Sequence, residues 1–417
     1  MNEEYKRQNE NEGDSNGFVT GFFTACIIFL FAWCLFLCVK VIRRETVVSE
    51  NKAVSGNMYV NDDQAVDEKL DEIETIIERK YIESVSAGDL EYGLCNGLIE
   101  SLDDPYADYY SPEEWIEMQK DTQGIYYGIG AYVSSSSDYL YPRISGIIKN
   151  TPAEEAGLQA DDIITEVAGT DVYDMKLDDV VALIRGEEGT TVHIVISRAE
   201  GNGRKKYEFD VERRRVESPT VDSEMKDDIG YIYIREFDMV TVDQFAEALA
   251  EVKEKGAKAL VIDLRSNPGG SLKAVVDIAG QILPAGKVVY TEDKYGKQEF
   301  YGSDGTKELD IPLAVLVNGD SASASEILAG AIKDYKKGTI VGTTTYGKGI
   351  VQQVFSLKDG SAVKLTVSHY YTPNGNDIHK VGIEPDVKVE FDRDAYLKDG
   401  TDNQLEKALE LLRKEIK

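Results

Sequence analysis

Two short segments of the sequence carry residue types that could perform nucleophilic catalysis. The first, Asn318–Glu326, has three serines at alternate positions, and the second places Lys348 between two glycines. A serine hydroxyl becomes a strong nucleophile when a neighbouring base accepts its proton, and a lysine serves as that base when burial lowers its pKa. The two segments predict a Ser-Lys pair, although their spacing leaves open which serine acts. The competing interpretation is a serine-rich helix cap and a solvated lysine in a glycine loop.

Apolar runs before both segments predict the strands that would position them. Ile311–Val317 has the character of a buried strand, and Glu326–Tyr335 has the apolar spacing of a helix. A strand, a tight turn and the start of a helix expose a side chain and direct backbone N–H groups at an anion. Thr339–Gly342 predicts a second short strand before the lysine segment.

A third segment, Asp263–Ser271, could supply hydrogen-bond donors for the same reaction. It ends an apolar strand and reads Asp-Leu-Arg-Ser-Asn-Pro-Gly-Gly-Ser, a turn that opens a helix. The backbone N–H of Gly269 or Gly270 could stabilise the oxyanion of an acyl-transfer intermediate. A Pro-Gly-Gly sequence alone is usually only a turn, so this interpretation depends on the other two segments sharing the domain.

Two other catalytic patterns fit less well. Gly342–Gly349 nearly matches the phosphate-binding loop G-x-x-x-x-G-K-[ST], but its last position is glycine, so the hydroxyl that would bind magnesium is missing. A Ser-His-Asp hydrolase would need one of the three histidines, His193, His369 or His379. The first two fall in predicted strands, which leaves His379 as the alternative base and favours lysine.

Charge and cysteine content exclude several classes of protein. The formal net charge is −30 and no basic stripe is present, so nucleic-acid binding is not expected. Three of the four cysteines lie in one apolar stretch, and Cys95 is alone in the rest of the chain. Neither a disulfide framework nor a zinc pattern follows from this arrangement. We expect no metal and no cofactor.

Phe18–Val39 is a charge-free apolar stretch of 22 residues. A helix of that length, at about 1.5 Å per residue, spans roughly 33 Å, which is the thickness of a bilayer core. A basic sequence follows it instead of a small-residue cleavage site, and this favours an uncleaved membrane anchor over a signal peptide. Two basic residues precede the stretch and three follow it closely, so the positive-inside rule leans against an exported C-terminal part.

The pattern of the chain changes several times after this stretch. Short helical stripes come first, and we expect them to pack on the core or to pair with a second copy in a homodimer. A block of short strands follows, and strands then alternate with helices, which indicates an α/β domain. The predicted organisation is a cytoplasmic tail at 1–17, a transmembrane helix at 18–39, a linker at 40–64, a helical region at 65–123, a strand-rich domain at 124–215, an α/β core at 216–390 and a helical tail at 391–417.

The strand-rich block resembles a PDZ domain, most specifically from Thr151 to Gly169. In that fold a peptide adds to a sheet edge, and a glycine loop holds its C-terminal carboxylate. The resemblance implies that the loop here is Tyr127-Gly128-Ile129-Gly130 and that the ligand is a protein C-terminus. A dinucleotide site at this loop is a weaker alternative, because the third glycine and the following helix are absent.

From about residue 66 to 390 the chain resembles the carboxy-terminal processing peptidases, the tail-specific serine proteases of family S41. This resemblance implies a crotonase/ClpP-like α/β protease core with an inserted PDZ domain. The motifs that carry it are Ser101-Leu-Asp-Asp-Pro-Tyr-Ala, Tyr127-Gly-Ile-Gly, Asp263–Gly270, Ser321-Ala-Ser-Ala-Ser-Glu-Ile, Gly347-Lys-Gly-Ile-Val-Gln-Gln, Tyr371-Thr-Pro-Asn-Gly and Gly382-Ile-Glu-Pro-Asp.

The family's register also assigns roles to individual residues. The middle of the three serines, Ser323, is the implied nucleophile, Lys348 is the base, and Gln352 orients it. The implied oxyanion hole combines Gly269 or Gly270 with the backbone N–H of Ala324. Further implied positions are two supporting acids, Glu326 and Asp334, and a residue that couples PDZ occupancy to the active site, Arg185.

The expected protein is therefore a membrane-anchored serine endopeptidase on the extracytoplasmic side of the cell membrane. Its PDZ domain would capture an apolar C-terminal tail and deliver the chain to Ser323. The alternative from another class is a non-catalytic PDZ scaffold that binds protein C-termini at the membrane.

Overall fold

The computed structural model describes residues 63–135 and 140–416. The predicted transmembrane segment at 18–39 lies outside these residues, as do the tail and most of the linker. Within the described ranges no helix is both long enough and apolar enough to cross a membrane. The chain forms two compact units, residues 1–87 and 88–417. The described part of the first unit contains one helix, α2 (Asp63–Lys80).

Helix α2 exposes part of the apolar stripe that the sequence predicted. Val66, Ile73 and Ile76 are 52%, 46% and 54% exposed. Side chains three and four positions apart lie on one face of a helix, so these residues form an apolar face that nothing described within this unit covers.

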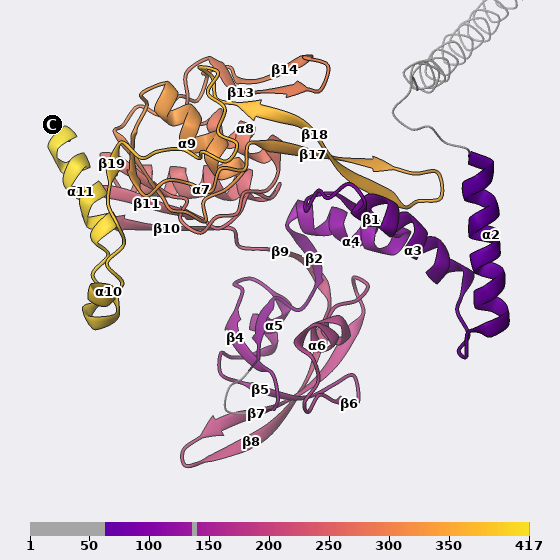
Figure 1. The fold of residues 1–417 in the computed structure, drawn as a ribbon. Helices are drawn as coiled ribbons and strands as arrows, with labels where there is room; N and C mark the ends of the chain where they lie inside the picture. Colours follow the sequence, from indigo (N-terminus) through magenta and orange to yellow (C-terminus); the bar gives the residue numbers. More distant parts are fainter. Residues whose placement is uncertain (1–62, 136–139, 417) are drawn as a thin grey trace, which may run out of the picture. The chain divides into compact units, whose positions relative to one another are not determined.

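The second unit begins with two helices and a short strand. The sequence Ser111-Pro-Glu-Glu predicts a helix cap, and this is confirmed, because Glu114 accepts a hydrogen bond from the Ser111 N–H and the Ser111 hydroxyl accepts one from the Glu114 N–H. Strand β1 pairs antiparallel with β18, which fixes this region to the core (Figure 1). The elements are α3 (Ala87–Glu100), β1 (Asp108–Tyr110) and α4 (Pro112–Gln123).

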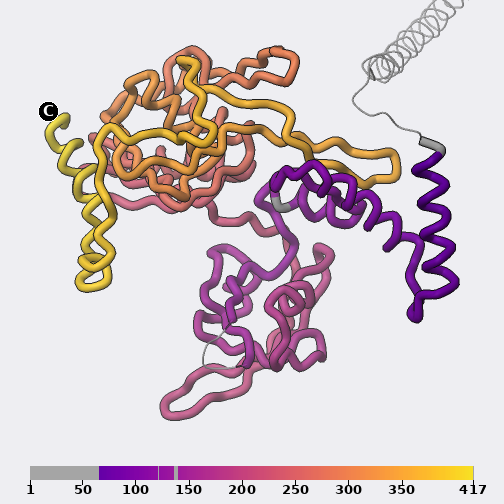
Figure 2. Tube along the Cα trace, viewed as in Figure 1, coloured from indigo at the N-terminus to yellow at the C-terminus, as the bar shows by residue number. Residues whose placement is uncertain are grey.

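The strand-rich region folds around its own hydrophobic core. Its sheet has the strand order β3-β4-β5-β7-β8, with β6 added to β5. Strands β2 and β9 pair with each other where the chain enters and leaves this region (Figures 1 and 2). The elements are β2 (Ile125–Gly128), β3 (Ala131–Ser134), β4 (Arg143–Ile147), α5 (Pro152–Ala156), β5 (Ile163–Val167), β6 (Thr170–Asp171), α6 (Leu177–Ile184), β7 (Thr191–Glu200), β8 (Gly203–Glu212) and β9 (Arg214–Glu217).

The α/β region is built on a six-stranded sheet in the order β10-β11-β12-β15-β16-β19. The strands are parallel except for β10. The elements of this layer are β10 (Val221–Lys226), β11 (Ile229–Ile234), α7 (Thr241–Glu254), β12 (Ala259–Asp263), α8 (Leu272–Ala279), β15 (Leu313–Val317), α9 (Ala324–Asp334), β16 (Thr339–Gly342), β19 (Val387–Lys388), α10 (Arg393–Asp399) and α11 (Asn403–Glu415).

Both faces of this sheet are covered, so its central strands are apolar at nearly every position. Leu260 and Ile262 of β12 pack in the cluster that contains residues of α7, α8 and α9, whereas Ala259 and Val261 pack with α11. Successive side chains of a strand point to opposite faces, and burial on both faces gives the continuous apolar runs seen in the sequence.

A second, antiparallel sheet has the order β1-β18-β13-β14, with β17 paired to β18. The sequence pattern at Val363–Tyr371 predicts β18, whereas no pattern predicts β13 or β14. The apolar spacing after Ser271 predicts a helix over Leu272–Leu283, but the helix ends at Ala279. The next residues form turns in which the Leu283 N–H donates to the Ala279 carbonyl. The further strands are β13 (Gly286–Asp293), β14 (Gln298–Ser303), β17 (Ile350–Ser356) and β18 (Ala362–Tyr371).

Three neighbouring parallel strands, β12, β15 and β16, each lead into one of the three candidate segments. The carboxyl ends of parallel strands lie at the same edge of a sheet, which is where α/β proteins place their sites. This topology brings together the predicted oxyanion turn (Asp263–Ser271), the serine segment and the lysine segment.

Candidate active site

Glu326 joins the serine segment to the lysine segment. It is fully buried in the first turn of α9. Its Oε2 accepts hydrogen bonds from the Ser323 N–H at 2.9 Å and the Lys348 N–H at 2.8 Å. Its Oε1 accepts from the Thr345 hydroxyl and the Gly347 N–H, both at 2.6 Å. One carboxylate therefore fixes the backbone of both predicted catalytic residues.

The same contacts explain why the lysine segment is not a phosphate-binding loop. The backbone N–H groups of Gly347 and Lys348 point at the Glu326 carboxylate. A phosphate would need such N–H groups for itself. Here the protein supplies its own buried anion to them.

Ser323 sits at the N-cap of α9 in a strained conformation. Its φ is +54° and its ψ is −113°, a region that residues other than glycine seldom adopt. The Ser323 N–H is held by Glu326, and its carbonyl accepts a hydrogen bond from the Tyr370 hydroxyl at 3.1 Å. Backbone contacts on both sides thus hold the strained residue in place.

The three serines of the first segment have different surroundings. The Ser321 hydroxyl donates to the Leu264 carbonyl at 2.8 Å, and the Ser325 hydroxyl donates to the Asn267 carbonyl at 3.0 Å. Both of these serines are fully buried. Ser323 instead lines a cavity of about 460 Å³, and of the three it is the one placed to meet a substrate.

Gly270 and Ala324 line the same cavity as Ser323. The Gly269 N–H is already used, because it donates to Asn267 Oδ1 at 2.8 Å. The N–H groups of Gly270 and Ala324 form no hydrogen bond with another described residue. Of the two predicted glycines, Gly270 is therefore the one whose donor is available to an oxyanion.

The oxyanion turn requires glycine for steric reasons. Gly269 and Gly270 have φ values of +110° and +136°. A Cβ on Gly270 would lie 2.4 Å from the Phe237 carbonyl oxygen, and one on Gly269 would lie 2.7 Å from Ser323 Cβ. Glycine permits both the positive φ and the close approach.

Lys348 is half-buried, and its surroundings lower its pKa. Burial is the larger cause, because the charged form loses its solvation, and the positive charge of Lys364 adds to the effect. Lys364 lines the Ser323 cavity and is held by the Tyr110 hydroxyl at 2.6 Å. A lowered pKa is the property that a lysine base requires.

The Lys348 ammonium packs against an aromatic ring. Its Nζ lies 4.2 Å from the centre of the Tyr106 ring, and it makes no hydrogen bond with Ser323 Oγ in the part of the chain that the structure describes. Gln352 does line the cavity, but its side-chain nitrogen donates to Thr366 Oγ1 at 3.2 Å. The structure therefore brings Ser323, Gln352 and the oxyanion donors together and leaves the lysine amine beside them.

The histidines lie outside this cavity. His379 packs edge-on against His369, with ring centres 5.4 Å apart. His193 is paired with Asp210 at 2.8 Å on strands β7 and β8. The second acid expected to support the site, Asp334, accepts a hydrogen bond from the Asn374 N–H at 2.8 Å and holds a turn.

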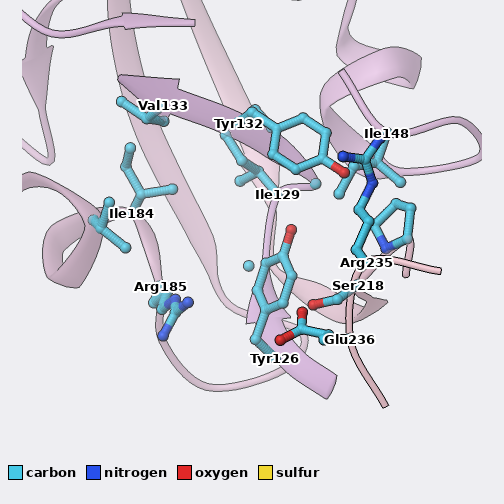
Figure 3. Close-up of a pocket in the computed structure, with 15 residues that line it drawn as sticks. Tyr126, Ile129, Tyr132, Val133, Ile148, Ile184, Arg185, Ser218, Arg235 and Glu236 are labelled. Atoms are coloured by element: carbon cyan, nitrogen blue, oxygen red, sulfur yellow. The ribbon is translucent and has the colours of Figure 1, made fainter. Parts of the chain in front are cut away.

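A second cavity, of about 580 Å³, lies beside α6 and β3 in the strand-rich region. Gly128, Ile129, Gly130 and Arg185 line it as predicted, whereas Tyr127 is absent from its lining. Its neighbour Tyr126 points into the cavity between Arg185 and Glu236 (Figure 3). Successive strand residues face opposite sides, and Tyr127 lines an adjoining cavity that also contains Arg185.

Tyr126 and Arg185 contact each other in this cavity. The Arg185 guanidinium carbon lies 5.2 Å from the centre of the Tyr126 ring. Burial raises the pKa of Tyr126 to about 12. Like an ordinary tyrosine it is neutral near pH 7, and its hydroxyl can donate a hydrogen bond to an acceptor in the cavity.

Comparison with known families gives three matches. Residues 228–389 match peptidase family S41, residues 143–198 match the PDZ domain, and residues 28–114 match the N-terminal domain of the activating protease CtpB.

Several known proteases resemble the chain over most of its length. It is 37% identical over 328 residues to the carboxyl-terminal-processing protease of Synechocystis sp., and the aligned region covers 77% of this chain and 76% of that relative. It is 35% identical over 346 residues to the carboxy-terminal processing protease CtpA of Bacillus subtilis, covering 82% and 73%. A solved structure of the photosystem II D1 C-terminal processing protease is 32% identical, with a TM-score of 0.45 and coverage of 76% and 85%.

Proposed function

Because the chain belongs to peptidase family S41 and is a serine-type peptidase, we propose that it cleaves polypeptides with a dyad formed by Ser323 and Lys348. The observation that carries this proposal is the contact between Glu326 and both backbones. It fixes the nucleophile and the base residue relative to each other at the cavity. The accessible hydroxyl of Ser323 and the lowered pKa of Lys348 support the same assignment.

In the proposed reaction Ser323 Oγ attacks the carbonyl carbon of the scissile peptide bond while its proton passes to Lys348 Nζ. The charge that develops on the carbonyl oxygen is stabilised by the N–H groups of Gly270 and Ala324. When the carbon–nitrogen bond breaks, Lys348 returns the proton to the leaving amine and an acyl-enzyme ester remains. Water then attacks the ester, again with Lys348 as base, and releases the new C-terminus and Ser323.

This reaction requires a movement of the lysine side chain. Lys348 Nζ must leave the Tyr106 ring and turn toward Ser323 Oγ. Gln352 must exchange Thr366 for Lys348 in order to orient the amine. The backbone of Lys348 need not move, because Glu326 already holds it beside Ser323.

We further propose that the PDZ cavity captures an apolar C-terminal tail of the substrate. Ile129, Val133, Ile148 and Ile184 line it and supply an apolar surface. The glycine loop at 128–130 supplies backbone N–H groups at one end, which is how peptide-binding domains of this kind hold a carboxylate.

A membrane anchor at Phe18–Val39, with the peptidase on the extracytoplasmic side, completes the proposal. Its support is the length and lack of charge of that stretch, together with the resemblance to the carboxy-terminal processing peptidases. Extraction of membranes at alkaline pH should leave the full-length chain in the pellet, and deletion of residues 18–39 should release it. Digestion of intact cells from outside should remove the peptidase part, and complete protection would contradict the orientation.

A homodimer is the remaining proposal. The exposed apolar side chains of α2, Val66, Ile73 and Ile76, fit a second copy of the same helix. Sedimentation of the full chain in detergent should report two copies, and Ile73→Glu should report one.

The catalytic assignment is tested by incubating the full-length chain with a folded protein that ends in an apolar tail. Intact-mass spectrometry should show defined fragments for the wild type and none for Ser323→Ala. Ser325→Ala is the matched control, because it removes a neighbouring hydroxyl that is buried and bonded to a carbonyl. If Ser325→Ala abolished cleavage and Ser323→Ala did not, the assigned nucleophile would be wrong. Binding without cleavage by the wild type would favour the PDZ scaffold.

A further inference from the structure

The peptide-binding cavity and the Ser323 cavity share one lining residue, Glu236. The peptide-binding cavity contains the glycine loop and Arg185, and the other cavity contains Ser323 and Gly270. A substrate whose C-terminus is held in the first and whose scissile bond lies in the second comes within reach of the residue common to both. Glu236 therefore lies beside the connecting stretch of substrate.

The backbone around Glu236 is fixed to the oxyanion turn. The next residue, Phe237, donates its N–H to the Gly269 carbonyl at 2.8 Å, and its carbonyl accepts from the Ser271 N–H at 2.7 Å. Phe237 is fully buried and anchors this contact in the core. The position of Glu236 is consequently set by the same turn that would stabilise the oxyanion.

The Glu236 carboxylate is available to a ligand. Its residue is exposed, and its carboxylate forms no ion pair or hydrogen bond with another residue of the described chain. The adjacent Arg235 is different, because its guanidinium pairs with Asp222 and lies 5.2 Å from the centre of the Tyr233 ring. In Figure 3, Glu236 lies next to Tyr126 at the edge of the peptide-binding cavity.

We propose that Glu236 is a specificity-determining residue that selects lysine or arginine in the substrate stretch between the captured C-terminus and the scissile bond. The proposal rests on the proposed function and adds a substrate preference to it. A cationic side chain in this stretch pairs with the carboxylate, whereas an acidic one is repelled by it. Pairs between exposed charges contribute little, so the expected preference is about two- to fivefold per favourable residue.

The test uses three peptides with the same apolar tail and the same scissile sequence. They differ at one position of the connecting stretch, which is lysine, glutamine or glutamate. For the full-length wild type, kcat/KM should decrease in that order by about two- to fivefold at each step. Glu236→Gln should bring the three values together, and Glu236→Lys should reverse their order. Added salt should compress the wild-type range, because it screens exposed charges.

Glu247→Gln is the matched control for this series. It removes the same charge from an exposed position on α7 that lines neither cavity, and the wild-type order should persist in it. The inference is overturned if the order survives in Glu236→Lys, or if Glu236→Gln lowers all three values by one common factor.

Binding separates this inference from the proposed function. The dissociation constants of the three peptides are measured on the Ser323→Ala variant, with and without Glu236→Lys. Absence of cleavage by the wild type would contradict the proposed Ser-Lys dyad. If the peptide affinities still followed the charge of the varied residue, and Glu236→Lys reversed their order, Glu236 would still be supported as the selecting residue. Equal binding of the three peptides would overturn it.

Discussion

Replacing Glu326 with glutamine should weaken the link between the serine segment and the lysine segment without changing the size of the side chain. In the better of its two orientations, the amide oxygen still accepts from Ser323 and Lys348 and the NH₂ group donates to Thr345. The NH₂ group then faces the Gly347 N–H, so one hydrogen bond is replaced by two opposed donors. The three surviving bonds no longer involve a charged acceptor.

The magnitude follows from these contacts. A hydrogen bond to a charged group contributes about 1.5–3 kcal/mol, and a buried donor left without an acceptor costs a similar amount. We expect Glu326→Gln to lower the free energy of unfolding by roughly 3 kcal/mol. Small displacements of catalytic groups reduce rates steeply, so kcat should fall about 100-fold. Urea unfolding and initial rates with a tailed peptide measure the two effects.

Asp334→Asn is the matched control, since it neutralises another acid of the same helix. Asp334 holds the Asn374 N–H of a turn and contacts neither catalytic segment. Its kcat should remain within about twofold of the wild type. The reasoning about Glu326 would be refuted if Glu326→Gln folded with unchanged stability and kept the wild-type kcat, or if both variants lost the same activity.

Three further predictions concern the cavity and its support. Gly270→Ala should lower kcat by about 100- to 1000-fold in steady-state assays, because the added Cβ would clash with the Phe237 carbonyl and displace the Gly270 N–H. An unchanged kcat would mean that another group supplies the oxyanion donor. Lys364→Gln removes a positive charge that lowers the pKa of Lys348. The rising limb of kcat/KM against pH should therefore move to higher pH, and a move to lower pH would contradict this cause. Arg265→Ala leaves the buried Asp263 carboxylate without its ion pair. The free energy of unfolding measured in urea should fall by about 3–5 kcal/mol, and a fall below about 1 kcal/mol would show that the pair is dispensable.

Elements with a continuous apolar run or a clear period could be predicted from the sequence. The apolar run Ile311–Val317 predicts the central strand Leu313–Val317, and the helical spacing of Val242–Lys255 predicts the helix Thr241–Glu254. Strand β14 could not be predicted, because it is largely exposed and Gln298–Ser303 shows no apolar alternation. Its pairing with β13 depends on a tertiary contact that the local sequence does not encode.

In the candidate site, too, the residue types could be predicted from the sequence, whereas their contacts could not. The residue types and the family register pointed to Ser323, and the surroundings of the three serines agree with that choice. The availability of Gly270 rather than Gly269 depends on where the Asn267 side chain turns. The position of the Lys348 amine depends on Tyr106, which is far away in sequence and reaches the site only after folding. Glu236 belongs to none of the sequence motifs, and its position in the lining of both cavities depends on the fold.

The Glu326 contact also makes proteolytic activity conditional on completed folding. The Glu326 carboxylate accepts a hydrogen bond from Ser323, which precedes α9. It accepts another from Lys348, which lies 22 positions after Glu326 and follows strand β16. Until β16 has docked beside β15, the backbone N–H groups of the lysine segment have no buried carboxylate to donate to. A chain still emerging from synthesis, or one that has partly unfolded, thus lacks an assembled site. Such an enzyme is inactive in the states in which its own exposed segments would be the nearest substrates.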